Sequence, residues 1–127
     1  KNELDIMLNK REFQNFVSTS EYPALLANYY LKKKDYQNAI KNLNKSIKIN
    51  PLKDGTIFQL AKIYLLLRKY PNARINLSKA IALDPLNVDY KVLWAKILYK
   101  STFDFNFILV LSNFRRSNFS GTFKRTK

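Results

Sequence analysis

The chain has 127 residues, of which 46% are hydrophobic and 14% aromatic, so it can bury the core of one folded domain. It contains no Cys and no His, which excludes disulfides, thiolate chemistry, imidazole catalysis and the common zinc sites. Its 23 basic and 9 acidic residues give a net charge of +14, which favours an acidic partner.

The start of the sequence and its hydrophobic runs bear on where the domain resides. Residue 1 is Lys rather than Met, so we expect the sequence to be a piece or a processed form of a longer protein. No hydrophobic signal peptide is visible, and the longest dense apolar run, residues 105–111, is far shorter than the roughly 20 residues of a membrane-spanning helix. These features favour a soluble, cytoplasmic domain.

The first predicted element is an amphipathic helix over residues 3–17. Its apolar residues recur near helical spacing. They are Leu4, Met7, Leu8, Phe13, Phe16 and Val17. Because the segment matches nothing later in the chain, we expect residues 1–19 to form an N-terminal capping helix that covers an open end of the domain.

Residues 20–53 and 54–87 are two copies of one unit, and they align without a gap. Both copies have Ala at the eighth and twentieth places, Tyr at the eleventh and seventeenth, and Leu at the twenty-fourth. These residues are Ala27, Tyr30, Tyr36, Ala39 and Leu43 in the first copy and Ala61, Tyr64, Tyr70, Ala73 and Leu77 in the second. The final prolines, Pro51 and Pro85, lie 34 residues apart. A repeat of this length predicts a helical hairpin.

Turn and cap residues divide each unit into two helices. Pro23 is suited to the first turn of a helix over residues 22–34, and Asp35 can cap a helix over residues 36–49. The second copy predicts helices over residues 54–68 and 70–83, with Pro71 in the first turn of the latter.

Residues 88–116 read as a partial, divergent third copy. A helix is expected over residues 88–100, with Ala95 at the eighth place. Phe107 and Phe114 stand where the earlier copies have small residues, although Leu111 still matches, so we expect that the third hairpin cannot close in the usual way. Residues 103–116 are apolar on more than one face, which favours packing within the chain or self-association. Residues 117–127 contain no acid and predict a loose basic tail.

The repeated pattern of residues 20–100 resembles the tetratricopeptide repeat: small-x2-Tyr, then Ala-x3-Leu-x2-small, then Pro two places after an aliphatic residue. The resemblance implies an all-α fold, a right-handed superhelical solenoid of antiparallel helix pairs. It also implies that the first helix of each pair lines a concave groove, and that the domain is a non-catalytic scaffold or adaptor for protein–protein interaction.

Carrying the groove places of that family onto this chain gives a mixed basic and apolar surface. The candidate peptide-binding residues are Asn28, Lys32, Phe58, Lys62, Leu65, Val92, Lys96, Tyr99 and Lys100. Asn28, Lys62 and Lys96 share the ninth place and would form a ladder of hydrogen-bond donors. This pattern favours an extended acidic, or mixed acidic and apolar, peptide as the ligand.

Some members of the family bind chaperone C-termini through a clamp for two carboxylates. Only Asn28 matches a clamp place, Gln59 is a weak substitute at a second, and Ala24, Asp89 and Leu93 stand where cations are required. We therefore expect no chaperone-tail binding of this kind.

The sequence offers no catalytic, metal or cofactor site. The acids Glu21, Asp35, Asp54, Asp89 and Asp104 lie at or beside predicted helix N-termini, where capping accounts for them. The alternatives to peptide binding are RNA binding by a helical-repeat module and peripheral association with an anionic membrane through an apolar helix followed by Arg115 and Arg116. The positive charge also has an equally good explanation that involves no acidic partner: the chain is rich in Lys, Asn and Ile, a composition that an AT-rich genome produces without selection for binding.

Overall fold

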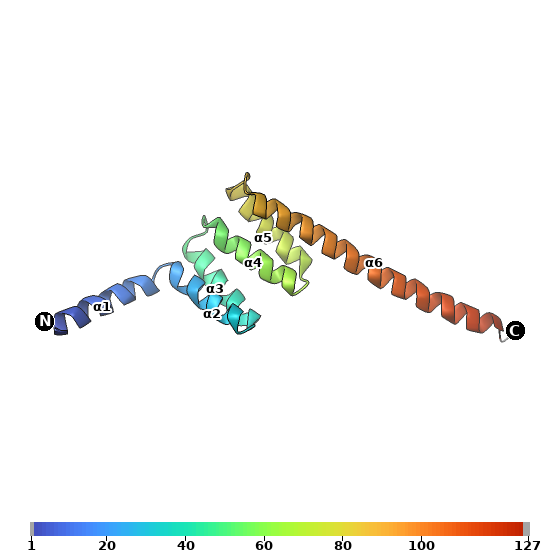
Figure 1. Cartoon of the computed structure of the whole chain (residues 1–127), viewed down its shortest axis with the longest axis horizontal. Helices are drawn as coiled ribbons and strands as arrows, with labels where there is room; N and C mark the ends of the chain where they lie inside the picture. The colour runs from blue at the N-terminus through green and yellow to red at the C-terminus, as the bar shows by residue number, and fades with distance from the viewer. Residues whose placement is uncertain (1, 126–127) are drawn as a thin grey trace.

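The computed structural model describes the backbone of residues 2–125 and the side chains of residues 9–116. This part of the chain forms six helices and no strands (Figure 1), which confirms the prediction of an all-α helical-repeat solenoid. The helices are α1 (Asn2–Val17), α2 (Glu21–Lys32), α3 (Tyr36–Ile49), α4 (Asp54–Leu66), α5 (Tyr70–Leu83) and α6 (Val88–Arg125).

The repeated small residues lie where the paired helices touch. α2 packs on α3 and α4 packs on α5 as hairpins. Ala27 and Ala39 of the first pair, and Ala61 and Ala73 of the second, have no exposed surface. A methyl group at these places lets the two backbones approach closely, and a larger side chain would push them apart.

Helix α4 is buried on two sides, which joins the two hairpins into one stack. Leu60 and Ile63 belong to a core cluster that also contains Leu43 of α3. Ile57 and Ala61 belong to a second cluster that reaches α5 and the first turns of α6. Neither hairpin could bury both faces of α4 alone, so the stability of the domain depends on stacking.

The turns between paired helices share an unusual backbone conformation. Asp35 caps α3 as predicted, because its Oδ1 accepts a hydrogen bond of 3.2 Å from the backbone N–H of Asn38. The residue before this cap, Lys34, has φ of 59°, and its counterpart Arg68 has φ of 58°. The left-handed region costs a residue with a Cβ atom about 1–2 kcal/mol, so each hairpin is closed at the expense of local strain.

Replacing Lys34 by Gly is expected to raise the free energy of unfolding by about 0.5–1 kcal/mol, because Gly adopts the left-handed conformation without a steric penalty. The adjacent Lys33, with φ of −87°, is the matched control, since its replacement removes the same charge. Lys33→Gly is expected to lower the free energy of unfolding by a similar amount. Urea denaturation measures both variants, and a change of the same sign in both would contradict the left-handed turn.

The third copy does not form a hairpin, because α6 continues as one helix through residues 88–125 (Figure 1). Thr102 stands at the place of Lys34 and Arg68, and a β-branched residue is especially unfavourable in the left-handed conformation. No Pro follows Pro85, so nothing else ends the helix. Consequently Ala95 is exposed, unlike Ala27 and Ala61.

Two further expectations differ from the structure. The loose basic tail expected from residue 117 is instead helical as far as Arg125, and residues 126–127 lie outside the described part. The expected capping helix, α1, extends away from α2 and α3 (Figure 1). Its described aromatic contacts join Phe13 and Phe16 to Tyr22, and Phe13 remains largely exposed, so α1 does not cover the first hairpin.

Candidate functional site

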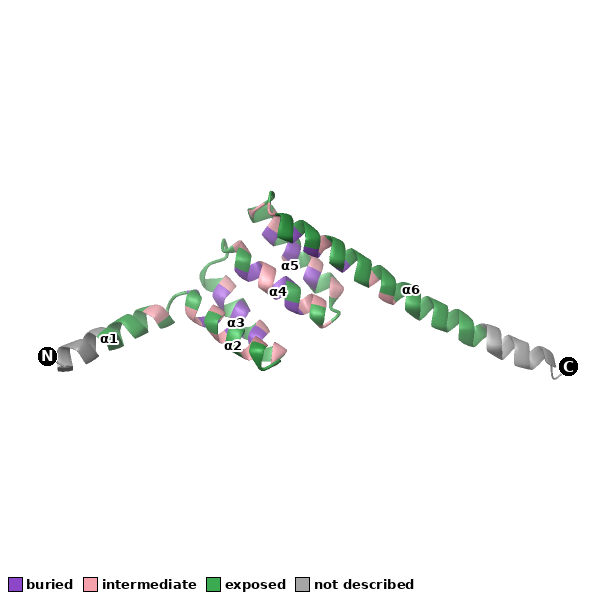
Figure 2. Cartoon of the chain, viewed as in Figure 1, coloured by how far each residue is buried: buried purple, intermediate pink, exposed green. Residues whose placement is uncertain are grey.

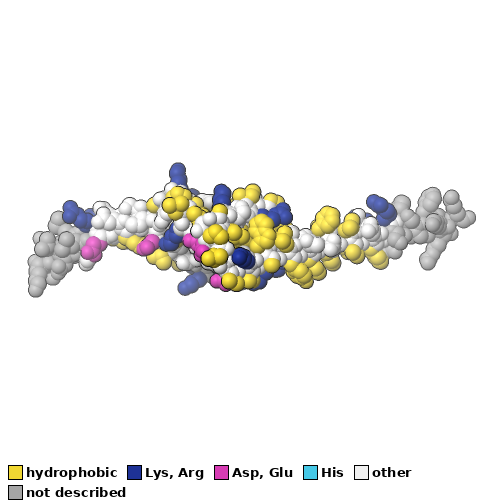
Figure 3. Space-filling model, turned by 90° about the horizontal axis from the view of Figure 1, so that it is seen from above, with side chains coloured by type: hydrophobic (Ala, Val, Ile, Leu, Met, Phe, Trp, Pro, Cys, Tyr) yellow, Lys and Arg dark blue, Asp and Glu magenta, His cyan; other side chains and the backbone are white. Residues whose placement is uncertain are grey.

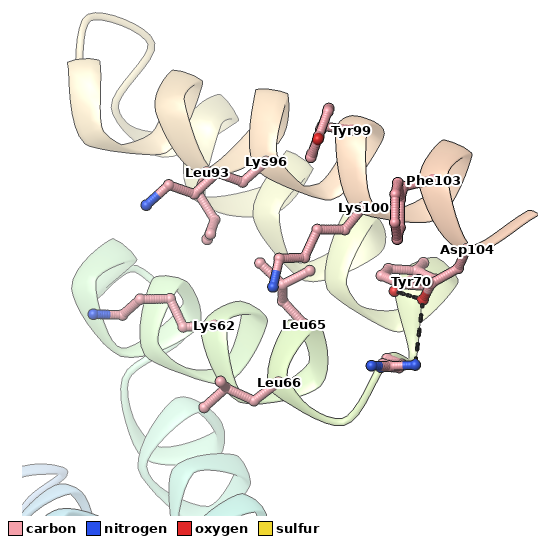
Figure 4. A pocket seen from close by; sticks show the side chains of 11 residues that line it. Lys62, Leu65, Leu66, Tyr70, Leu93, Lys96, Tyr99, Lys100, Phe103 and Asp104 are labelled. Atoms are coloured by element: carbon pink, nitrogen blue, oxygen red, sulfur yellow. Dashed lines mark hydrogen bonds and ion pairs between the residues drawn. The ribbon is translucent and has the colours of Figure 1, made fainter. Parts of the chain in front are cut away.

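A hollow of about 730 Å³ lies between α4 and α6 (Figure 4). Because α6 does not turn back, its middle section forms one wall, α4 forms the other, and the α4–α5 turn closes one end. The lining residues are Lys62, Leu65 and Leu66 of α4, Arg68 of the turn, Tyr70 of α5, and Leu93, Lys96, Tyr99, Lys100, Phe103 and Asp104 of α6. We call this hollow the α4–α6 groove.

The floor and one wall of the α4–α6 groove are apolar. Leu93 is buried at its base, and Leu65 is partly buried beside it. Tyr99 and Phe103 lie one turn apart on α6 with stacked rings, 6.3 Å between centroids. Phe107 continues the stack at 6.5 Å from Phe103. The apolar wall of the groove therefore extends along α6 past the end of the repeats.

The rim of the groove carries four cations and one acid. The cations are Lys62, Arg68, Lys96 and Lys100, and in Figure 4 the Lys100 side chain extends from α6 toward Leu65 of α4. The acid, Asp104, is already engaged: its Oδ2 accepts a hydrogen bond from the Tyr70 hydroxyl and lies 3.9 Å from an Arg68 guanidinium nitrogen. That hydrogen bond raises the pKa of Tyr70. Three lysines thus face the groove without a carboxylate in it to pair with.

Asp104 corrects one sequence-based expectation. It was assigned to a helix N-terminus, but it lies in the interior of α6, because α6 does not break before it. It occupies the seventeenth place of the third copy, where Tyr36 and Tyr70 stand in the first two. Its contacts with Tyr70 and Arg68 hold the middle of α6 against the α4–α5 turn.

A second set of contacts fixes the other end of the groove wall. The Tyr90 hydroxyl donates to Asp54 at the N-terminus of α4. Burial raises the pKa of Tyr90, and this hydrogen bond raises it further. The centroid of the Tyr90 ring lies 4.6 Å from that of the Phe58 ring. The Lys62 ammonium lies over the same Phe58 ring, 4.8 Å from its centroid. These contacts set both the distance between α4 and α6 and the position of Lys62.

The structure brings together five of the nine predicted groove residues. Lys62, Leu65, Lys96, Tyr99 and Lys100 all line the α4–α6 groove.

The remaining four predicted residues lie elsewhere. Asn28 lines a separate depression of about 370 Å³ between α2 and α4, so it is not continuous with the two lysines of the proposed ladder. Phe58 is partly buried beneath Lys62, where it packs on the core. Lys32, in the last turn of α2, and Val92, on α6, are exposed and line neither hollow.

Leu66 and Leu93 aside, four lining residues were not among the nine candidates: Arg68, Tyr70, Phe103 and Asp104. All lie close to where the third hairpin would have turned, so they face the groove only because α6 is continuous. One sequence feature could have revealed them. The seventeenth place of the repeat changes from Tyr to Asp at residue 104, and this Asp is a hydrogen-bond partner for Tyr70.

Comparison with known proteins supports the repeat assignment. The family model described as "Tetratricopeptide repeat" matches residues 24–51 and 55–85, which correspond to the α2–α3 and α4–α5 hairpins. None of the curated proteins compared with the chain matches it. Among the helices in the described part of the chain, none is both long enough and apolar enough to cross a membrane.

Proposed function

We propose that this chain, a tetratricopeptide-repeat protein with two complete repeats, is a non-catalytic scaffold that holds an acidic and partly apolar peptide segment in the α4–α6 groove. Tetratricopeptide repeats generally mediate protein–protein interaction, which supports the general role. The observation that carries the specific proposal is the composition of the groove: cations on the rim, apolar side chains on the floor, and its one acid already bound.

The geometry of the rim favours carboxylates as ligands. Lys62 and Lys96 occupy the same place of successive repeats, so they present ammonium groups from two adjacent helices on the two sides of one groove. Lys100 lies one turn further along α6. Ammonium groups form charge-assisted hydrogen bonds with carboxylates, and the hydrophobic floor would receive a Leu, Ile or Phe side chain placed between two acids.

Three of the nine acidic residues have structural roles, which supports a non-catalytic function. Asp35 caps α3, Asp54 accepts from Tyr90, and Asp104 accepts from Tyr70. General acid–base chemistry in a chain without His would need carboxylates that are free to exchange protons with a substrate.

Selection from a displayed library of random peptides tests the proposal. We expect the enriched peptides to combine Asp or Glu with large apolar residues, and a labelled enriched peptide to bind the full chain in fluorescence anisotropy with an affinity that falls as salt is added. A single-stranded RNA of similar length serves as the comparison ligand. Enrichment of basic peptides, or preferential binding of the RNA, would contradict the proposal.

A further inference from the structure

Helix α6 packs on the repeats along one face and leaves a second apolar face in solvent. Tyr90, Leu93 and Ile97 are buried against α4 and α5. On another side of the same helix lie Ala95, Leu98, Thr102, Phe105 and Leu109, all exposed. These five residues alternate in steps of three and four, the spacing of a coiled-coil contact line. We call them the α6 seam.

The α6 seam is apolar where it is most exposed. Phe105 is 66% exposed, Leu109 48% and Leu98 44%. Figure 2 shows that α6 beyond the repeats is mostly exposed as far as residue 116, where the described side chains end, and Figure 3 shows hydrophobic side chains along this part. The exposed apolar residues between Val92 and Phe114 together offer on the order of 1,000 Å², but they lie on several faces of α6, and the seam holds only part of this area.

We propose that a second copy of this chain covers the α6 seam, with the two α6 helices antiparallel and crossing at Thr102. In each complete repeat, the two helices of the hairpin run antiparallel on either side of the left-handed residue, Lys34 or Arg68. Thr102 is the same place of the third copy. A partner helix that crosses there occupies the side of α6 that the missing helix of the third hairpin leaves open.

The seam is complementary to itself about Thr102, as a two-fold symmetric interface requires. In an antiparallel pair centred on this residue, Ala95 faces Leu109 of the second copy, and Leu98, four residues before the centre, lies within one residue's rise of Phe105, three residues after it. A small residue therefore meets a large one at each end.

The open end of the stack also has room for the second helix. A hollow of about 320 Å³ lies between α5 and the first turns of α6, beside the start of the seam, and is lined by Ser78, Ile81, Lys91 and Trp94. Trp94 is the single Trp of the chain and is partly buried there, so its fluorescence will report on pairing. A lipid surface fits α6 less well, because an interfacial helix needs a broad polar face, and the segment 103–111 has only Asp104 and Asn106 as polar residues.

Charge gives the dimer a distinctive dependence on salt. Each copy carries a net charge of +14, so the two copies repel each other. Added salt screens this repulsion and is expected to strengthen association, whereas it weakens the binding of an acidic peptide in the α4–α6 groove. The dimer does not depend on the peptide-binding proposal, and the opposite salt responses keep failure of one distinct from failure of the other.

Sedimentation equilibrium of the full chain, together with Trp94 emission, tests the dimer. We expect the 15.0 kDa chain to form a species of twice that mass at micromolar concentrations, with emission that shifts to the blue as the dimer forms. The double variant Phe105→Glu/Leu109→Glu changes two exposed seam residues and is expected to weaken association at least about a hundredfold. Phe107→Glu/Val110→Glu is the matched control: it changes two equally exposed residues of α6 outside the seam and is expected to remain dimeric.

Three outcomes would overturn the proposal. The first is a wild-type chain that stays monomeric at every concentration and salt. The second is a dimer that survives the seam variant or is lost equally in the control, which would mean pairing through another surface. The third is a monomeric chain that sediments with vesicles of anionic phospholipid and loses this binding in the seam variant, which would assign the seam to a membrane.

Discussion

Leu77→Ala is expected to lower the free energy of unfolding by about 3 kcal/mol, the largest effect of any substitution considered. Leu77 stands at the twenty-fourth place of the second repeat and has no exposed surface. It lies in the cluster where α4, α5 and α6 meet, so its truncation removes packing within the hairpin and between the hairpin and α6. Urea denaturation followed by circular dichroism measures the loss.

Leu111→Ala is the matched control, because Leu111 occupies the same place of the third copy and is 51% exposed on α6. The same chemical change is expected to alter the free energy of unfolding by less than about 0.5 kcal/mol at concentrations where the chain is monomeric. A cost for Leu111→Ala similar to that of Leu77→Ala would mean that residues 103–116 fold back as a third hairpin.

Lys62→Glu/Lys96→Glu is expected to weaken binding of a selected acidic peptide by at least about tenfold, or about 1.4 kcal/mol. Both lysines line the α4–α6 groove and face no free carboxylate in it. Each reversal replaces an attraction for the ligand with a repulsion. Fluorescence anisotropy with one labelled peptide, at the same salt concentration for all variants, measures the change.

Lys41→Glu/Lys79→Glu is the matched control for charge. It separates the loss of local contacts in the groove from the loss of long-range attraction between a basic protein and an acidic peptide. These lysines are exposed on α3 and α5 and line none of the hollows described above, and the substitution lowers the net charge by the same amount. We expect less than a threefold loss of affinity for this control, through the long-range field alone. If the two double variants lose the same amount of affinity for the peptide, the peptide does not bind in the α4–α6 groove.

The repeats themselves could be predicted from the sequence because their signals are local and occur twice. Small residues at the eighth and twentieth places, Leu at the twenty-fourth and a terminal Pro each act within one hairpin. The structure buries Ala27 and Ala61 completely, whereas Ala95, at the same place of the third copy, is exposed. The bounds of the four helices of the two repeats differ from the predicted ones by at most two residues, which is the usual scatter at helix ends.

The course of α6 could not be predicted from the same signals. Phe107 and Phe114 indicated that a third hairpin could not pack closely, but they did not indicate that a single long helix would form in its place. The deciding residue is Thr102, and its importance is visible only once Lys34 and Arg68 are known to have positive φ. A Lys or an Arg does not predict a residue with positive φ, since Gly and Asn are the residues that normally adopt this conformation at the end of a helix.

The composition of the groove was predicted better than its location. The mixture of cations and apolar residues followed from the repeat places, and five of the nine residues do lie together. Phe103 and Asp104 were missed because they lie beyond the point where the repeat pattern breaks. Arg68 and Tyr70 were missed because they lie at the α4–α5 turn and not at a groove place of the repeat. Asn28 is separated from Lys62 because it lines the hollow between α2 and α4, whereas Lys62 lines the hollow between α4 and α6.

One distance tests most directly whether α6 is a single continuous helix. The chain has no Cys, so Asp89→Cys/Asn113→Cys allows two spin labels on exposed sites of α6 that are 24 residues apart. Gly55→Cys/Lys79→Cys places labels at the same two places of the second repeat, where the Gly55 position has free space for a side chain. An excess of unlabelled chain removes distances between copies. We predict about 36 Å for the α6 pair, from a rise of 1.5 Å per residue, and less than about 20 Å for the hairpin pair. A short distance for both pairs would contradict the account.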